Sequence, residues 1–200
     1  MLQKLKSEST KQLILNESYK LFYKNGFKTT SIDKIMKETK LTKGAFYHHY
    51  KNKRELGLAV IKLKLQERVY DLMISPLYTS IDAIELLKLT FLDKIKSFSI
   101  EEKQQGCPMN NLINEIGDSE KVYQTALKSI MEEWKLAVVQ LIERGKKEKT
   151  IQTSISSKSV AVYLISAFEG IRGIRKIYDN DEVVDQYRLG LSMYINQIKA

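Results

Sequence analysis

The 200-residue sequence has few of the residues that interrupt or cross-link a chain. Its prolines are Pro76 and Pro108, and its one cysteine is Cys107. A single cysteine cannot form an internal disulfide, so we expect a protein of the reducing cytoplasm. No apolar run approaches the ~20 residues of a membrane-spanning helix. The first ten residues also lack the apolar core of a signal peptide, so we expect neither a membrane span nor a leader.

Motifs of catalysis and metal binding are lacking as well. The sequence contains no G-x-x-x-x-G-K-[ST], no H-E-x-x-H and no G-x-S-x-G segment. The adjacent pair His48 and His49 does not suit a metal ion, because neighbours on a helix diverge by ~100°. We therefore expect no enzyme, no cofactor and no metal site.

The apolar residues of the sequence follow mainly a helical periodicity. Strand-like alternation is scarce, and apolar residues recur at three- and four-residue spacing, which predicts an all-α fold of about nine helices. Polar loops are expected at 99–108 and 148–157. The expected helices lie at about 9–24, 30–39, 42–49, 52–75, 81–98, 111–116, 119–147, 158–178 and 182–198.

Positive charge is concentrated in the first third of the chain. Residues 1–60 hold 13 Lys or Arg against 5 Asp or Glu, whereas residues 61–200 hold 20 against 19. Almost all of the formal charge of +9 therefore lies at the N-terminal end. This bias favours a polyanionic partner, which a basic surface attracts by releasing counterions. A solvated basic face would show the same bias.

Two short helices with a tight connection follow the first helix. Thr30 and Asp33 have the T-x-x-D form of a capping box, and Thr42 is placed to cap the next helix. If Phe46 points into the core, Tyr47 points outward. This arrangement predicts a helix-turn-helix, in which the first helix crosses the DNA backbone and the second enters the major groove.

The expected DNA contacts are small, cationic, aromatic or hydroxyl side chains near these helix ends. Lys43 can donate to guanine O6 and N7, and Gly44 allows a close approach of the helix backbone. Hydroxyls and free N–H groups at helix N-termini suit phosphates. The full set is Thr30, Ser31, Thr42, Lys43, Gly44, Tyr47, His48, His49 and Lys53.

The segment GFKTTSIDKIMKETKLTKGAFYHHYKNKREL resembles the N-terminal domain of TetR/AcrR-family transcriptional regulators over about residues 9–60. The resemblance implies an all-helical homodimer with an N-terminal DNA-binding domain and a C-terminal domain for dimerisation and effector binding. We place these domains at 1–54 and 55–200. Lys40 departs from the glycine that many members have in the turn, and a left-handed φ costs a lysine ~1 kcal/mol.

The segment GCPMNNLINEIGD, residues 106–118, resembles a G-C-x-x-x-N-L-x-x-E pattern in a subset of the family. Some members of that subset sense electrophiles or oxidants through the cysteine. Cys107 lies near an expected helix N-terminus, which favours the thiolate. Lys176 falls where such sensors carry a basic residue. The alternative is that Cys107 is a small buried hydrophobe.

A second effector mode is the reversible binding of a small molecule in a pocket of the C-terminal helices. Aromatic and methionine side chains at helical spacing are candidates for its lining, although such residues are more often plain core. The candidates are Phe91, Met109, Asn110, Trp134, Tyr163 and Phe168.

The last expected helix has an apolar stripe, which must pack against other apolar surface to be shielded from water. The stripe suits a four-helix dimer interface formed by the last two helices of each subunit, or packing within its own domain. The expected interface residues are Tyr163, Ile171, Val184, Tyr187, Leu191, Tyr194 and Ile198.

Together these features predict an effector-responsive transcriptional regulator, with a repressor as the expected form. It would bind a palindromic operator in double-stranded DNA as a homodimer and leave it when a small ligand binds or Cys107 is modified. A basic helical protein that binds anionic membranes is the alternative, but the basic third has no helix with a Trp/Phe-and-Lys surface. The sequence does not predict the operator sequence, the regulated genes or the identity of the effector.

Overall fold

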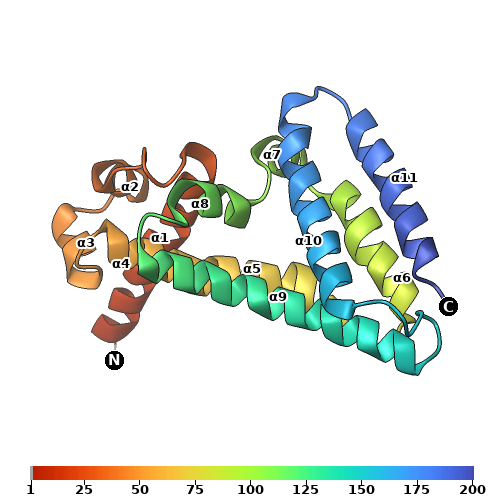
Figure 1. The fold of residues 1–200 in the computed structure, drawn as a ribbon. Helices are drawn as coiled ribbons and strands as arrows, with labels where there is room; N and C mark the ends of the chain where they lie inside the picture. The colour runs from red at the N-terminus through yellow and green to blue at the C-terminus, as the bar shows by residue number, and fades with distance from the viewer. Residues whose placement is uncertain (1) are drawn as a thin grey trace. The chain divides into compact units, whose positions relative to one another are not determined.

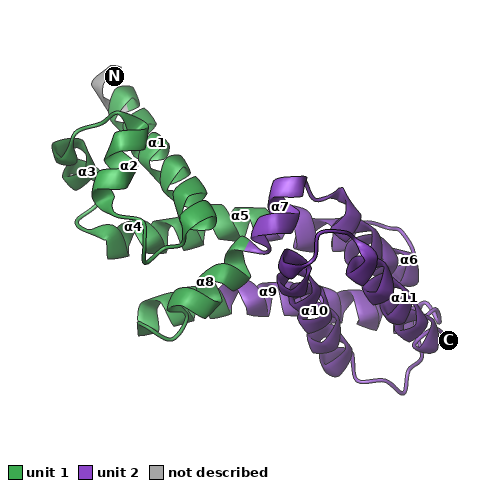
Figure 2. Cartoon of the chain, turned by 90° about the horizontal axis from the view of Figure 1, so that it is seen from above, with its two compact units in different colours: residues 1–68, 108–128 green, residues 69–107, 129–200 purple. Residues whose placement is uncertain are grey.

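The computed structural model describes residues 2–200, with side chains from Leu5 onward. Helices make up most of the described chain. The β pairing in this part of the chain is an isolated antiparallel bridge between Ile151 and Lys199. The prediction of an all-α fold is confirmed. The chain forms two compact units, unit 1 (1–68 and 108–128) and unit 2 (69–107 and 129–200), which Figure 2 colours separately. The expected division after residue 54 concerns function and stays a prediction; the compact units divide the chain differently.

Unit 1 contains the expected helix-turn-helix and a later segment of the chain (Figure 1). Its helices differ little in position from those expected, except that α1 begins seven residues earlier. The residues of α1 before Ser9 are mostly polar, and Leu5, Lys6 and Glu8 are exposed, so no apolar face that repeats over several turns marks them. The elements are α1 (Leu2–Asn25), α2 (Ile32–Thr39), α3 (Lys43–His49), α4 (Lys53–Ala59), the π-helical η1 (Val60–Leu65), α5 (Gln66–Val69), α8 (Pro108–Ile116) and the start of α9 (Lys121–Lys147).

The core of unit 1 is aromatic where α1 ends. The Phe27 ring packs edge-on against Phe22, with centroids 4.8 Å apart, and against Tyr123, at 5.7 Å. Gly57 of α4 lies against the same ring, because a Cβ built there would stand 2.6 Å from Phe27 Cε2. The absence of a side chain at residue 57 therefore lets α4 approach the turn that follows α1. Phe46 of α3 is fully buried in the same unit, as its spacing predicts.

Unit 2 contains the remaining helices. One of them, α7, lies in a segment that we expected to be a loop. Ser99 caps α7, and Glu102 completes a capping box by accepting from the Ser99 N–H at 2.9 Å. The elements are η2 (Tyr70–Ile74), η3 (Ser75–Tyr78), α6 (Ala83–Lys88), η4 (Leu89–Asp93), η5 (Lys94–Ser97), α7 (Ile100–Gln105), the rest of α9, α10 (Ser157–Ile174), η6 (Arg175–Ile177) and α11 (Glu182–Gln197).

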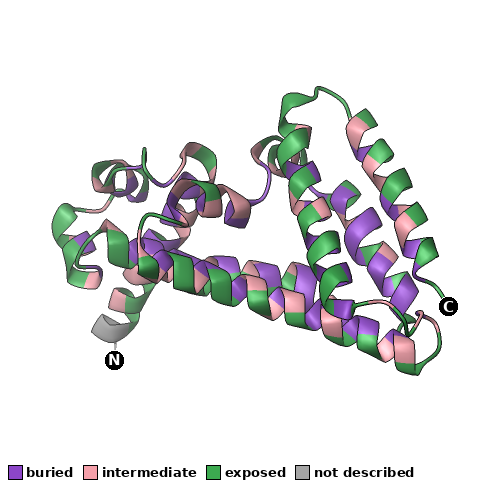
Figure 3. Ribbon diagram, viewed as in Figure 1, coloured by how far each residue is buried: buried purple, intermediate pink, exposed green. Residues whose placement is uncertain are grey.

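The apolar stripe of α11 packs inside unit 2, which corrects the predicted dimer interface (Figure 3). Tyr187 donates a hydrogen bond to the Phe91 carbonyl at 2.9 Å, and the Tyr194 ring lies 4.4 Å from that of Tyr163. The stripe is therefore the face that α11 turns toward its own domain. The prediction is wrong for the residues that are buried there, which are Ile171, Val184, Leu191 and Ile198.

A different strip of α10 and α11 faces outward. On α10 the exposed residues include Val162 and Ile174, and on α11 they include Leu189 and Met193, each at least 50% exposed. Glycines accompany them, and a Cβ at any of these would meet nothing within 4 Å. They are Gly170, Gly173 and Gly190.

Among the residues that the structure describes, none of the helices combines the length and hydropathy that crossing a bilayer requires.

Candidate nucleic-acid interface and effector region

The two helices of the helix-turn-helix are fixed by hydroxyl caps and a left-handed turn. The Lys34 N–H donates to the Ser31 hydroxyl at 3.1 Å, and the Ala45 N–H donates to the Thr42 hydroxyl at 3.2 Å. Lys40 ends α2 with φ 55° and ψ 30°. This is the left-handed conformation that we expected of the turn, and it directs the chain into α3.

One side of α3 is buried and the other is exposed. Phe46 is inaccessible to solvent, whereas Tyr47 is 56% exposed and Lys43, Gly44 and His48 are exposed. A Cβ at Gly44 would meet only the Thr42 hydroxyl, at 3.7 Å. Packing within the protein therefore does not require a glycine there. The missing side chain would instead allow the backbone of α3 to approach another surface closely.

Lys43 is held by an ion pair with Asp33 of α2. Its Nζ lies 2.7 Å from Asp33 Oδ1, and both side chains are more than 60% exposed. The hydrogen bond with Asp33 and its negative charge raise the pKa of Lys43. An exposed pair of this kind contributes little to stability. The pair holds the lysine ammonium group beside α2.

In the structure, Thr30 does not lie on the outward surface of the helix-turn-helix. Its side chain is fully buried, and its hydroxyl donates to the Gly26 carbonyl at 2.7 Å. The predicted capping role belongs instead to the neighbouring Ser31, whose side chain is exposed. Thr30 therefore stabilises the turn after α1, and its side chain cannot touch DNA in this conformation.

Lys53 and His49 lie partly inside the protein. The Lys53 ammonium group donates to the Lys28 carbonyl at 3.2 Å and stands 4.5 Å from the Phe27 ring centre. Burial lowers the pKa of Lys53, and burial also lowers the pKa of His49, with the neighbouring His48 adding to the effect. A phosphate contact by Lys53 would require its ammonium group to leave these partners.

Sequence reasoning assigned no role to Glu115 of α8. Its carboxylate accepts hydrogen bonds from the Phe27 N–H at 2.7 Å and from the Lys28 N–H. It therefore holds the turn between α1 and α2, where Gly26 has φ 88°. Glu115 is the last position of the G-C-x-x-x-N-L-x-x-E pattern, so the sequence did contain a signal for it.

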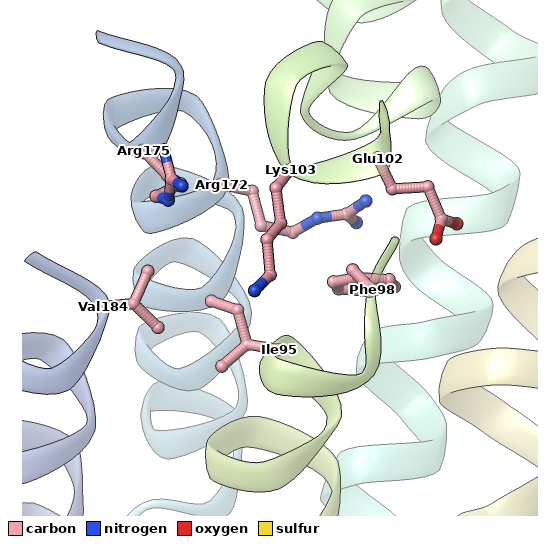
Figure 4. A pocket seen from close by; sticks show the side chains of 7 residues that line it. All are labelled: Ile95, Phe98, Glu102, Lys103, Arg172, Arg175 and Val184. Carbon is pink, nitrogen blue, oxygen red and sulfur yellow. The ribbon is translucent and has the colours of Figure 1, made fainter. Parts of the chain in front are cut away.

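The expected ligand-binding aromatics form a closed core. Trp134 packs between Phe91, at 6.4 Å between ring centres, and Phe168, at 6.2 Å. These three and Met109 are at most 1% exposed. They line neither the small cavity beside Phe98 and Arg172 (Figure 4) nor the open hollow beside Asp181 and Leu189. In this structure the rings pack against one another and leave no open pocket between them, and ligand binding at these residues stays a prediction.

Cys107 is buried, at 6% exposure, immediately before α8. Its thiol is hydrogen-bonded to the Glu169 carboxyl. Lys176 lies beside the preceding residue, since a Cβ at Gly106 would stand 2.4 Å from Lys176 Cε. The structure thus brings Lys176 next to the segment that holds the cysteine. A reagent would need a local opening to reach the thiol.

Comparison with known proteins agrees with this architecture. Residues 14–60 match the family model described as "Bacterial regulatory proteins, tetR family". Residues 86–191, more than half of the chain, match the model described as "Tetracyclin repressor-like, C-terminal domain".

Individual relatives extend over most of the chain. The HTH-type transcriptional repressor DhaR of Mycobacterium sp. (strain GP1) is 26% identical over 181 residues, which cover 88% of this chain and 87% of DhaR. Crystal structures of TetR-family regulators from Cytophaga hutchinsonii and Chloroflexus aurantiacus share the fold, each with a TM-score of 0.86. The first is 22% identical and covers 98% of this chain and 97% of that one; the second is 24% identical and covers 97% and 98%. With both of its regions matched, the chain belongs to the TetR family of bacterial regulatory proteins.

Proposed function

We propose that this chain is a transcriptional repressor that binds a palindromic operator as a homodimer and releases it when an effector binds. The outward face of α3 carries this proposal. It presents Lys43, Gly44, Tyr47 and His48 to solvent, in the part of the chain that holds most of the net positive charge. A short helix with such a face suits the major groove of DNA.

Each exposed group has a contact that it can make. Lys43 would leave Asp33 and donate to guanine O6 and N7, while Gly44 lets the helix axis approach the bases. Tyr47 and His48 would reach phosphates or a thymine methyl group. Further phosphate contacts would come from Ser31, Thr42, His49 and Lys53.

The homodimer would use the outward strip of α10 and α11. This strip is apolar or uncharged around Val162, Ile174, Leu189 and Met193, and its glycines allow helices to approach closely. Two copies related by a two-fold axis would bury both strips against each other. Their α3 helices would then stand ~34–36 Å apart, one turn of DNA, and read a palindrome.

Release of DNA requires an effector that binds one state of the dimer better than the other. The α8 segment is placed to pass on such a preference. It begins directly after Cys107, and its Glu115 holds the turn after α1. A shift of α8 would therefore disturb the base of the helix-turn-helix.

Substitution of Lys43 by alanine tests the DNA-binding proposal. We expect K43A to lower the affinity for a specific duplex by ~1–3 kcal/mol and to relax the preference at one base pair. Fluorescence anisotropy with labelled duplexes measures both effects. An unchanged affinity and base preference would refute the role of Lys43.

Anionic membranes are the competing partner for a basic helical protein. Binding to phosphatidylserine vesicles and to duplex DNA at the same salt concentration separates the two. Preference for the vesicles would contradict the proposal.

Modification of Cys107 is a second route to release, favoured by its contact with Glu169 and by the position of Lys176 beside Gly106. If this route operates, N-ethylmaleimide should release DNA from the parent protein and not from C107S, a result read by the same anisotropy assay. Release from C107S as complete as from the parent would rule out sensing by the cysteine.

A further inference from the structure

The ion pair between Asp33 and Lys43 joins the two helices of the helix-turn-helix on their exposed side. Asp33 lies in the first turn of α2, and Lys43 is the first residue of α3. Lys43 Nζ and Asp33 Oδ1 are 2.7 Å apart, and the two side chains are 62% and 66% exposed. The structure therefore presents a charged donor and a charged acceptor to solvent side by side.

The fold has little need of the Asp33 carboxylate at this place. The cap of α2 is the Ser31 hydroxyl, which accepts from the Lys34 N–H at 3.1 Å. An exposed ion pair contributes little to stability. An acid in the first turn of a helix interacts favourably with the helix dipole, but this effect does not require a lysine partner. Stability therefore does not explain why Asp33 is paired with Lys43.

For DNA binding in general, a carboxylate beside Lys43 is unfavourable. The first helix of a helix-turn-helix crosses the DNA backbone, and the phosphates of any duplex repel a negative charge there. When Lys43 turns to a guanine, the Asp33 carboxylate also loses the partner that it has in the free protein. An unpaired charge inside an interface costs free energy unless the DNA supplies a donor for it.

One kind of base pair offers partners for both side chains. Across the major groove, a G·C pair presents the guanine N7 and O6 acceptors and then the cytosine N4 amino donor. Guanine O6 accepts a hydrogen bond from cytosine N4, so these two atoms lie about 2.9 Å apart. This spacing is close to the 2.7 Å that separates Lys43 Nζ from Asp33 Oδ1.

An A·T pair presents its groups in a different order, namely acceptor, donor, acceptor. A lysine and a carboxylate placed for G·C would there meet a donor and an acceptor, respectively, and both contacts would be repulsive. The same side chains would also meet the wrong groups on a G·C pair turned end for end. The order of donor and acceptor in the ion pair therefore distinguishes one base pair, in one orientation, from the other three.

We propose that Asp33 and Lys43 together recognise one G·C pair in each half-site, with Lys43 donating to guanine O6 and N7 and Asp33 accepting from cytosine N4. The ion pair exchanges partners with the base pair, so neither charge is left unpaired. At any other base pair the carboxylate lacks a donor, which adds a repulsive element to the specificity. Because it concerns DNA contacts at the helix-turn-helix, this proposal rests on the function proposed above.

Selection from a library of random duplexes tests the part that Asp33 plays in base preference. We expect the parent to enrich a G·C pair, in one orientation, at one symmetric pair of positions, and D33A to lose that preference as K43A does. E38A is the matched control, because Glu38 is also an exposed acid of α2. Both substitutions remove one negative charge, so a general electrostatic effect would appear in both. E38A should keep the preference, and circular dichroism checks that each variant is folded.

A base analogue tests the contact with cytosine N4 itself. In both half-sites of the selected duplex, 2-pyrimidinone, which lacks the 4-amino group, replaces the cytosine of this pair. Fluorescence anisotropy then compares the parent and D33A on the natural and the altered duplex. We expect the parent to lose about tenfold in affinity per half-site and D33A to lose less than about threefold. The weaker pairing of the analogue affects both proteins, so the difference between the two losses measures the Asp33 contact.

The same replacement at a G·C pair outside the half-sites should leave the affinity of the parent unchanged. The proposal is overturned if D33A keeps the base preference of the parent, or if the altered duplex weakens both proteins equally. It is also overturned if the selected palindrome contains no G·C position that depends on Lys43. These results would leave the proposed function intact, because the parent still binds a palindrome. A parent that binds no duplex would contradict the proposed function, and this proposal with it.

Discussion

Lys40 shows how one residue carries the geometry of the helix-turn-helix. Its left-handed conformation, at φ 55°, joins α2 to α3. This conformation costs residues other than glycine ~1–2 kcal/mol. The turn forms nevertheless, because Ile35 and Met36 before it and Phe46 after it are buried and fix the two helices.

Replacement of Lys40 by glycine should stabilise the protein. We expect K40G to raise the free energy of unfolding by ~0.5–1 kcal/mol, since relief of strain outweighs the added entropy of the unfolded chain. Urea denaturation followed by circular dichroism measures the change. K37G, in the last turn of α2, is the control and should lower stability by up to ~1 kcal/mol. Destabilisation by K40G would contradict the conformation assigned to Lys40.

The structural roles of single residues were predictable where one residue of a suitable type stands at the position that the role requires. The capping role of Thr42 and the inward direction of Phe46 follow from spacing and are confirmed. The cap of α2 was assigned to Thr30 because two adjacent hydroxyls compete there, and spacing does not separate them. The structure separates them by burial: Thr30 bonds the Gly26 carbonyl and Ser31 caps the helix.

The helix α8 has a specific contact with the turn between α1 and α2 in unit 1. Its Glu115 carboxylate satisfies two backbone N–H groups at the end of α1. Glu120, which directly precedes α9, adds an ion pair with Arg54 of α4. These acidic groups tie α8 and the start of α9 to the base of the helix-turn-helix.

Removal of the Glu115 carboxylate should loosen this connection. We expect E115A to lower the free energy of unfolding by about 1–3 kcal/mol, the usual effect of losing hydrogen bonds to a charged acceptor. E115Q keeps one oxygen acceptor and should lose less. N114A, at the exposed neighbouring position, should change stability by less than ~0.5 kcal/mol. Urea denaturation measures all three, and equal values for E115A and N114A would show that the contact is unimportant.

Helix positions were predictable where an apolar face repeats over several turns, as in α9 and α10. The prediction failed where that signal is weak. The first turns of α1 have no apolar face that repeats over several turns. The helix α7 is short and has no buried residue, so its Ser99–Glu102 capping box was the available clue. For α11 the period was right, but periodicity alone does not say whether its own domain or a second subunit covers the stripe.

For the whole molecule, the outward strip of α10 and α11 should determine the oligomeric state. A charge in the middle of a dimer interface costs several kcal/mol when it is left unpaired. We expect M193E to convert a homodimer into a folded monomer of 23.2 kDa and to weaken DNA binding. Analytical ultracentrifugation and circular dichroism measure mass and fold. L136E, at an exposed position on α9, should stay dimeric; a dimeric M193E would place the interface elsewhere.

The fold class and the exposed face of α3 were predictable because both depend on local patterns, namely helical periodicity and caps within about 60 residues. The packing of unit 2 was not, because it depends on contacts between distant segments. For example, Phe98 and Lys103 come close to Arg172, Arg175 and Val184 around a small gap in unit 2. The sequence does not show that these positions meet, and it suggested the aromatic core instead.

The central claim is that two α3 helices read neighbouring major grooves of one duplex. Selection of bound sequences from a library of random duplexes, followed by sequencing, tests it most directly. The account predicts enrichment of a palindrome whose half-site centres lie about 10 base pairs apart, or a whole multiple of that spacing, with the preference at one symmetric pair of positions lost in K43A. Enrichment of no sequence, or of one without two-fold symmetry, would contradict the account.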